Sequence, residues 1–168
     1  MPEKRTLERA REDRREGKSP STQAGEFVRE EIEHIREGKH GARSAKQAIA
    51  IGLSKARRSG VKLGAPKKGR ASSRVRRKAQ QDLKRGRAAS RRRSAARSRA
   101  VTRALKREGR SAASERSLAR QARSSARKRG AAARHRAAEK AVRTKGEREL
   151  HEAAVKSART RVAHRRAA

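Results

Sequence analysis

Apolar residues recur at intervals of three and four over two stretches near the start of the chain. Those of the first stretch, residues 22–37, are Ala24, Phe27, Val28, Ile32 and Ile35. Those of the second, residues 45–59, are Ala45, Ala48, Ile49, Gly52, Leu53 and Ala56. This spacing places each set on one face of a helix and predicts two amphipathic helices joined as an antiparallel hairpin.

Cap residues mark where these helices begin and end. Ser19 or Thr22 can cap the first helix, and Pro20 suits its first turn. Gly38 is the residue type expected just past a helix end. Residues 44–47, SAKQ, fit the capping-box pattern and predict the start of the second helix.

The segment before the hairpin, residues 3–16, is a candidate polar helix rich in Arg and Glu. Its only large apolar residue is Leu7, so nothing in the pattern obliges it to pack. The hairpin alone offers few large apolar side chains against the entropy of ordering it. We therefore expect it to gain stability from self-association or from a partner surface.

The pattern changes near residue 65. Arg and Ala make up about half of residues 65–168, and both favour helices. Three similar phrases, LKREG, ARKRG and VRTKG, end at Gly109, Gly130 and Gly146. They predict helical segments that each end with bases and then glycine, although like charges four residues apart oppose helix formation.

The resulting prediction is an all-α chain with three parts. Residues 1–18 form a polar helix or arm, residues 19–64 a small helical-hairpin head, and residues 65–168 a cationic tail that is disordered or segmentally helical. Leu, Ile, Val and Phe number 19 of 168 residues, which is about 11% of the chain. So low a content, together with high charge, predicts that only part of the chain folds around a core.

Charge changes the picture most. The chain has 52 Lys and Arg against 17 Asp and Glu, a formal net charge of +35. Residues 65–168 hold 36 of these bases and only 7 acids. Such a surplus implies a polyanionic partner, because each phosphate neutralised by a base releases condensed counterions.

Several kinds of chemistry are not expected. The chain lacks cysteine, an apolar run of about 20 residues and an apolar signal segment, so we expect no disulfide, membrane span or secretion. No nucleophile and base are paired by spacing, so we expect no enzyme, cofactor or small-molecule substrate. The histidines are expected to be ordinary surface residues without a metal: His34, His40, His135, His151 and His164.

The bend between the predicted helices, residues 38–44, has the sequence GKHGARS. It lacks the order of a nucleotide-binding loop and has no strand before it. Lys39, His40 and Arg43 could together hold one phosphate at the start of the next helix. The other interpretation is a hairpin bend with solvated bases, and the two can coexist.

The run GKSPSTQAGEFV, residues 17–28, followed by REEIEHIREGKHGARSAKQAIAIGLSKARRSGVKL, resembles a family of small basic bacterial proteins. These are largely uncharacterised and often labelled DNA-binding or plasmid-stabilisation proteins. The resemblance covers about residues 1–68 and implies a bacterial source and DNA binding, but no site residue. In composition, the tail resembles the basic tails of linker-histone-like bacterial proteins.

The predicted function is histone-like: sequence-independent binding and compaction of duplex DNA by the tail, in the cytoplasm at the nucleoid, with the head positioning or dimerising. The scarcity of aromatic residues disfavours single-strand binding. The residues expected to contact nucleic acid are Lys39, Arg43, Lys55, Arg57, Arg58, Lys67, Lys68, Arg76, Arg77, Arg91, Arg92, Arg93, Arg127, Lys128 and Arg129.

Two alternatives stay open. One is a structured-RNA or ribosome-associated protein, since such proteins share Arg- and Ala-rich helices. The other is a regulatory interaction protein that the tail tethers to nucleic acid. Its head would bind a protein partner through Phe27, Ile32, Ile35, Ile49 and Leu53.

Overall fold

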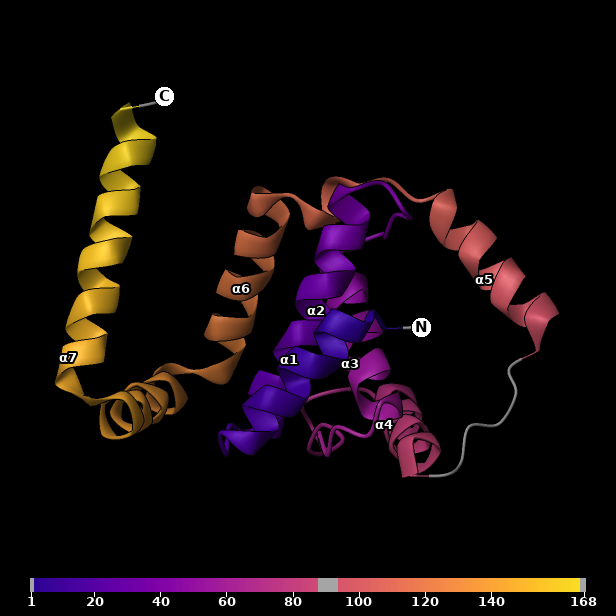
Figure 1. Ribbon diagram of the computed structural model, residues 1–168, viewed down its shortest axis with the longest axis horizontal. Coiled ribbons are helices and arrows are strands. Elements are labelled where there is room, and N and C mark those ends of the chain that lie inside the picture. Colours follow the sequence, from indigo (N-terminus) through magenta and orange to yellow (C-terminus); the bar gives the residue numbers. More distant parts are fainter. Residues whose placement is uncertain (1, 88–93, 167–168) are drawn as a thin grey trace. The chain divides into compact units, whose positions relative to one another are not determined.

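The computed structural model describes residues 2–87 and 94–166, and their side chains except those of residues 87, 144, 145 and 164–166. All regular structure in these residues is helical, which confirms the all-α prediction (Figure 1). The elements are α1 (Lys4–Arg15), α2 (Pro20–Arg36), α3 (Ala45–Arg58), α4 (Ser73–Arg87), α5 (Ala95–Lys106), the 3₁₀ turn η1 (Ser111–Ala113), α6 (Glu115–Arg129) and α7 (Ala131–Arg166).

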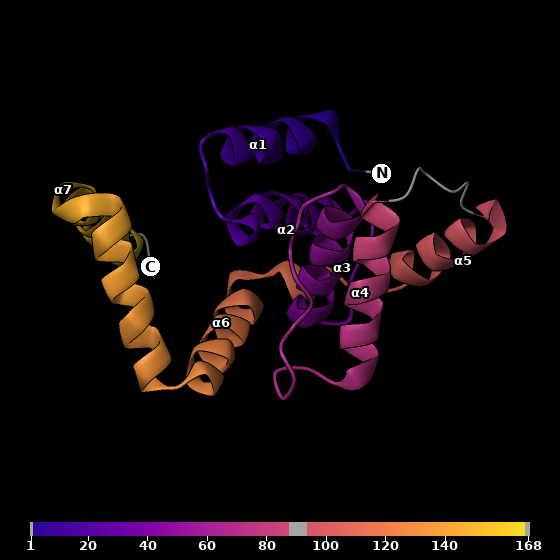
Figure 2. The same ribbon diagram turned by 90° about the horizontal axis from the view of Figure 1, so that it is seen from below.

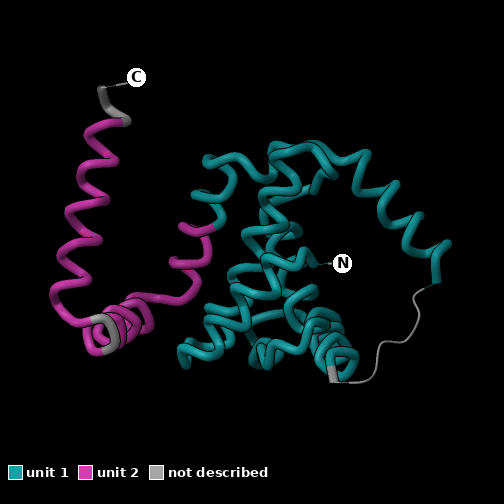
Figure 3. The backbone as a smooth tube through the Cα atoms, viewed as in Figure 1, with its two compact units in different colours: residues 1–121 teal, residues 122–168 magenta. Residues whose placement is uncertain are grey.

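The chain divides into two compact units, residues 1–121 and 122–168 (Figure 3). The second unit holds the end of α6 and all of α7, and none of its described side chains is buried. Gly146, with φ of 74°, interrupts α7 and divides it into two helices. The described part of the second unit therefore consists of helices without a hydrophobic core of their own.

The predicted hairpin is confirmed as α2 and α3. Ser19 caps α2 by accepting a hydrogen bond from the N–H of Thr22, and Pro20 is its first residue. Ser44 caps α3 by accepting from the N–H of Gln47 at 3.2 Å. The capping box is only half formed, because the Gln47 amide oxygen accepts from the Arg43 N–H instead of the Ser44 N–H.

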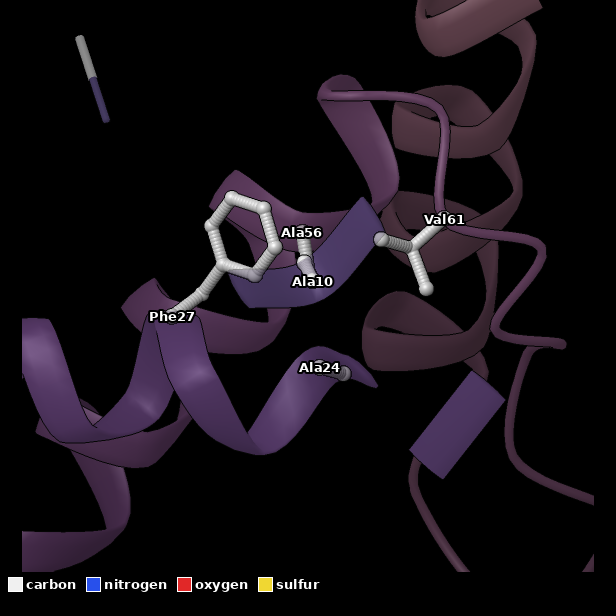
Figure 4. Packing of buried hydrophobic residues seen from close by; sticks show 5 residues of the cluster. All are labelled: Ala10, Ala24, Phe27, Ala56 and Val61. Atoms are coloured by element: carbon white, nitrogen blue, oxygen red, sulfur yellow. The ribbon is translucent and has the colours of Figure 1, made fainter. Parts of the chain in front are cut away.

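The contact between α2 and α3 is close because a glycine lies in it. A Cβ atom added to Gly52 would lie 2.7 Å from the Cα of Val28. Beside this contact, Phe27 is fully buried with Ala10, Ala24, Ala56 and Val61 (Figure 4). One aromatic ring surrounded by small side chains thus forms the first part of the core.

The expectation that residues 3–16 need not pack is wrong. Helix α1 lies along α2, with Ala10 only 6% exposed and Leu7 packed against the Phe27 cluster (Figure 2). The pattern was misleading because it counted large side chains only. An alanine on a close helix contact also removes apolar surface from water.

The expectation of a small hairpin head at residues 19–64 is also wrong, and of the two states expected for residues 65–168, disordered or segmentally helical, their described part has the helical one. Helix α4 packs against α3, on the side of the hairpin away from α1 (Figure 2). Ala79 and Asp82 are buried there, and a Cβ atom added to Gly86 would collide with the Arg57 carbonyl oxygen. Asp82 accepts a hydrogen bond of 2.7 Å from the Ser54 hydroxyl. The compact unit therefore continues well beyond residue 64.

A second part of the tail docks on the hairpin bend. The N–H of Gly41 donates to the Leu105 carbonyl at 2.9 Å, and the N–H of Ala42 donates to the Gly109 carbonyl at 3.2 Å. Ala112 and Ala113 of η1 are buried in a second core cluster, whose other members are Ile35, Ala42 and Ala48, with Ile32 packed against it. Residues 105–113 thus cover this end of the hairpin, so the chain itself supplies packing that we expected from self-association or a partner surface.

The predicted segmentation of the tail is confirmed at three glycines. Helix α5 ends at Lys106, shortly before Gly109, and α6 ends at Arg129, directly before Gly130. The break in α7 falls on Gly146. Glycine ends helices readily because it adopts positive φ without steric cost, as at Gly130 with φ of 76°.

A buried charged cluster joins the first three helices. Lys55 Nζ lies 3.1 Å from Glu30 Oε1 and 2.6 Å from Glu31 Oε2, and both carboxylates are at most 3% exposed. The N–H of Glu3 donates to Glu30 Oε2 at 3.1 Å. Burial raises the pKa of Glu30, but hydrogen bonds from Thr6, the Glu3 N–H and Lys55 outweigh this and hold the pKa below its ordinary value.

Replacing Gly52 by alanine should destabilise the protein by about 1–3 kcal/mol, because the new methyl group would overlap the α2 backbone. Chemical unfolding followed by circular dichroism measures this. Gly25→Ala is the matched control, since Gly25 lies in α2 with nothing within 4 Å of an added Cβ. The control should gain about 0.5–1 kcal/mol. Equal effects of the two changes would contradict the close contact.

Glu30→Gln should cost about 2–4 kcal/mol, because it removes one partner of a buried ion pair. A carboxylate whose pKa is lower in the folded than in the unfolded protein stabilises the folded state. This stabilisation is complete above the unfolded pKa of about 4.3 and is lost as the pH falls through the folded pKa. The wild type should therefore lose more stability than Glu30→Gln as the pH falls from about 5 to about 3. Glu33→Gln, on the exposed side of α2, should retain the wild-type pH profile.

Candidate nucleic-acid interface

The structure turns the predicted bases of α3 toward the protein. Lys55 is held by two carboxylates. Arg57 is 7% exposed and donates to the carbonyls of Leu63 and Gly64, and burial lowers the pKa of its guanidinium. Arg58 donates to the Ser54 carbonyl and lies 3.8 Å from Asp82. These three side chains fix the packing of α3.

The two bases predicted in the bend, Lys39 and Arg43, are exposed but lie beside carboxylates of the chain. Lys39 Nζ lies 2.9 Å from Glu37 Oε2 and 3.2 Å from Glu3 Oε1. The side chain of Arg43 is 81% exposed, with Nε 3.7 Å from Glu108 Oε1. The backbone N–H groups of residues 41 and 42 donate to the docked tail segment. The bend is therefore built to receive residues 105–113, which leaves few donors for a phosphate.

Helix α4 carries the most regular basic surface in the first unit. Its exposed bases, together with the exposed Gln81 between them, recur at intervals of three and four, which places them along one side of the helix. They are Arg74, Arg77, Lys78, Lys84 and Arg85, and we call them the α4 stripe. Gln81, also exposed, lies within the stripe. From first to last residue the stripe is about 16 Å long, at 1.5 Å per residue.

The α4 stripe lies outside the face that packs on α3. Ala79, Asp82 and Gly86 make the packing contacts, and the centre of their face lies about a third of a turn from the centre of the stripe. Arg76, which the sequence analysis selected, is half-buried, and its Nε is shielded from solvent. Packing of Ala79 and Asp82 thus directs one set of bases outward and draws Arg76 toward the interior.

Sequence reasoning selected Arg77 but missed four members of the stripe. It ranked bases by adjacency in runs, whereas a helix gathers bases by periodicity. The missed signal was the three- and four-residue spacing from residue 74 to residue 85. It could have been found by testing the polar positions of this segment for helical period.

The remaining predicted residues lie apart from the stripe in the chain. Lys67 and Lys68 are exposed in the connection between α3 and α4. Arg127, Lys128 and Arg129 are exposed in the last turn of α6, within the second unit. The run at residues 91–93 lies outside the described residues.

Helix α5 adds a second exposed basic element. It contains no acidic residue, and none of its residues is buried. Arg99 and Arg103 are four residues apart and both exposed, so they lie on the same side of the helix. Like charges at this spacing repel, and a bound phosphate would relieve that repulsion.

The structure also brings two histidines, which the sequence analysis expected to be ordinary surface residues, together with a carboxylate as possible metal ligands. Ligand atoms of Glu31, His34 and His40 lie within 4.8 Å of one another. They come from one face of α2 and from the bend that follows it. In sequence spacing alone they match no common metal motif.

Among the described residues, no helix combines the length and the apolar character needed to cross a membrane. Comparison with protein-family models, with curated proteins and with solved structures finds no match. The resemblance of residues 1–68 to small basic bacterial proteins stays a prediction.

Neutralising the α4 stripe should weaken binding to duplex DNA and flatten its salt dependence. If each base neutralises one phosphate, changing all five residues to Gln should reduce the slope of log affinity against log salt by about 4. The measurement is a fluorescence-anisotropy titration at several salt concentrations.

The matched control removes five exposed bases from α1, where glutamates alternate with the bases. These residues are Lys4, Arg5, Arg11, Arg14 and Arg15. The control carries the same net charge as the stripe variant. Equal loss of slope in the two variants would show that total charge, not the α4 stripe, determines binding.

Proposed function

We propose that this protein binds double-stranded DNA without sequence preference and compacts it, as a histone-like protein of the bacterial nucleoid. The hairpin and the elements packed on it act as a scaffold that presents the α4 stripe. The exposed bases of α5, α6 and α7 extend the contact along further phosphates.

The observation that supports this proposal most directly is the α4 stripe. Five bases occupy about 16 Å of an exposed helix face with no acidic residue among them. Duplex DNA carries about one negative charge per 1.7 Å of axis, hence about ten over the same length. The stripe can therefore approach one side of a duplex with each base near a phosphate.

The charge balance of the tail supports distributed binding. Seven acids cannot neutralise the 36 bases of residues 65–168, so most of these bases remain available to an external anion. Arginine forms bidentate hydrogen bonds with phosphate, which suits backbone contacts rather than base reading. With a single Phe and no Tyr or Trp, the chain offers little stacking surface for unpaired bases.

The packing of the hairpin argues against a protein partner on its apolar face. Phe27 and Ile35 are fully buried by the chain's own elements. Ile32, Ile49 and Leu53 are half-buried. A partner would have to displace α1 or residues 105–113 to reach this face, and no described feature favours that exchange.

Full-length protein should bind duplex DNA with a log–log salt slope of about −6 or steeper, which corresponds to roughly seven or more phosphates. Affinity should differ little between unrelated duplexes of equal length. Anisotropy titrations with matched DNA and RNA duplexes measure both quantities.

Binding of duplex RNA at least about tenfold tighter, near 1.4 kcal/mol, would favour the structured-RNA alternative instead. A shallow slope with strong preference for one DNA sequence would also overturn the proposal. Changing Arg127, Lys128 and Arg129 to Gln tests the second unit separately, and should reduce the slope by about 2–3.

A further inference from the structure

Glu31, His34 and His40 form a cluster at the C-terminal end of α2. Helix α2 ends at Arg36 and is followed by Gly38 with φ of 79°, and the Lys39 N–H donates back to the His34 carbonyl at 2.9 Å. This turn reverses the chain and brings the His40 ring beside that of His34, with centroids 6.1 Å apart. The three side chains are 1%, 13% and 15% exposed, in chain order.

The cluster contains a buried carboxylate oxygen without a hydrogen-bond donor. Neither oxygen of the Glu31 carboxylate has a hydrogen-bond donor of good geometry, although the side chain is 99% removed from solvent. The ammonium of Lys55 at least compensates the charge at Oε2, from which it lies 2.6 Å away. Oε1 faces Nε2 of His40 at 3.4 Å. Buried carboxylate oxygens in proteins are normally paired, so this one indicates a missing cation or proton.

The hydrogen bonds of the two rings leave lone pairs for a cation. Nδ1 of His40 lies 3.1 Å from the Gly41 carbonyl, to which only an N–H can donate. In the neutral ring, Nε2 then carries a lone pair directed toward Glu31. Nε2 of His34 lies 2.8 Å from Glu3 Oε1, which orients that ring. Metal-binding histidines commonly donate their second nitrogen to a carboxylate or carbonyl in this manner.

The geometry points to a divalent transition-metal site, formed by Glu31 Oε1 and one ring nitrogen each of His34 and His40. Two imidazoles and one carboxylate are ligands that suit Zn²⁺, with a fourth position for water. Tetrahedral bonds of about 2.0–2.1 Å place ligand atoms about 3.3 Å apart, so atoms now within 4.8 Å need to move inward by about 1.5 Å at most.

Local charge favours a cation at this point of a strongly basic protein. The carboxylates of Glu3, Glu30 and Glu31 lie around the cluster, against the ammonium groups of Lys39 and Lys55. The nearest ammonium groups are already paired with these carboxylates. A divalent ion would complete the neutralisation of the buried carboxylate.

A metal at this site would affect how residues 105–113 pack on the hairpin bend. His40 directly precedes Gly41, whose N–H binds the Leu105 carbonyl and whose missing side chain makes room for the Glu108 backbone. A metal bound by residues 31, 34 and 40 ties the bend to α2. It would thereby hold the surface on which residues 105–113 pack.

The test uses full-length, nucleic-acid-free protein and zinc chloride, with affinity measured by competition against a chromophoric chelator. One equivalent should bind, and the melting temperature should rise with bound metal. His34→Gln and His40→Gln should each weaken this affinity by about tenfold or more. His135→Gln and His151→Gln, on α7, are the matched controls and should leave it unchanged.

Glu31→Gln is not used as a test, because Glu31 also pairs with Lys55 in the interior and its loss can prevent folding. Each histidine variant is compared with the wild type by circular dichroism before zinc is added. Histidine proton NMR gives a second readout: on adding zinc, the signals of His34 and His40 should shift before those of the α7 histidines. Affinity that is the same in the His40 and His135 variants would overturn the site. A His40 variant with a lower melting temperature but wild-type affinity for zinc would also overturn the site. It would show that His40 and Glu31 form a structural imidazolium–carboxylate pair instead.

Discussion

Close backbone contact at small residues is the constraint on which this structure depends. The chain has few large apolar side chains, so its helices can exclude water only by approaching closely. Gly52 admits the backbone of α2, Gly86 admits the end of α3, and Gly41 admits residues 108–109. Alanines fill the space around these contacts, with Phe27 and Ile35 as the large members of the core.

Such a thin core brings charged residues into the interior. Lys55 lies between Glu30 and Glu31, Asp82 accepts from Ser54, and Arg57 is satisfied by backbone carbonyls. These contacts contribute specificity, because each group needs its partner once it is removed from water. They also divide the bases into two classes, those that hold helices together and those that face solvent.

That division connects the fold to the proposed function. Packing of α4 through Ala79, Asp82 and Gly86 leaves five bases aligned on its outer side. The second unit lacks buried side chains among its described residues, so its bases do not hold a core together as Lys55 and Arg57 do in the first unit. A scaffold with an ordered basic stripe, followed by exposed basic helices, is suited to a partner with regularly spaced phosphates.

The sequence by itself determined the helices of the hairpin, the cap of the second helix at Ser44, the choice of Ser19 or Thr22 as the cap of the first, the glycines that end the tail helices, and the concentration of positive charge in residues 65–168. These follow from local spacing, backbone preference and total charge, which need no knowledge of distant contacts. Only the tertiary structure decided that α1, α4 and residues 105–113 join the core, and that Glu31, His34 and His40 meet. The physical reason is that alanine and glycine give almost no pattern in a sequence, whereas their small size decides which helices can touch, and those contacts decide which charges are buried.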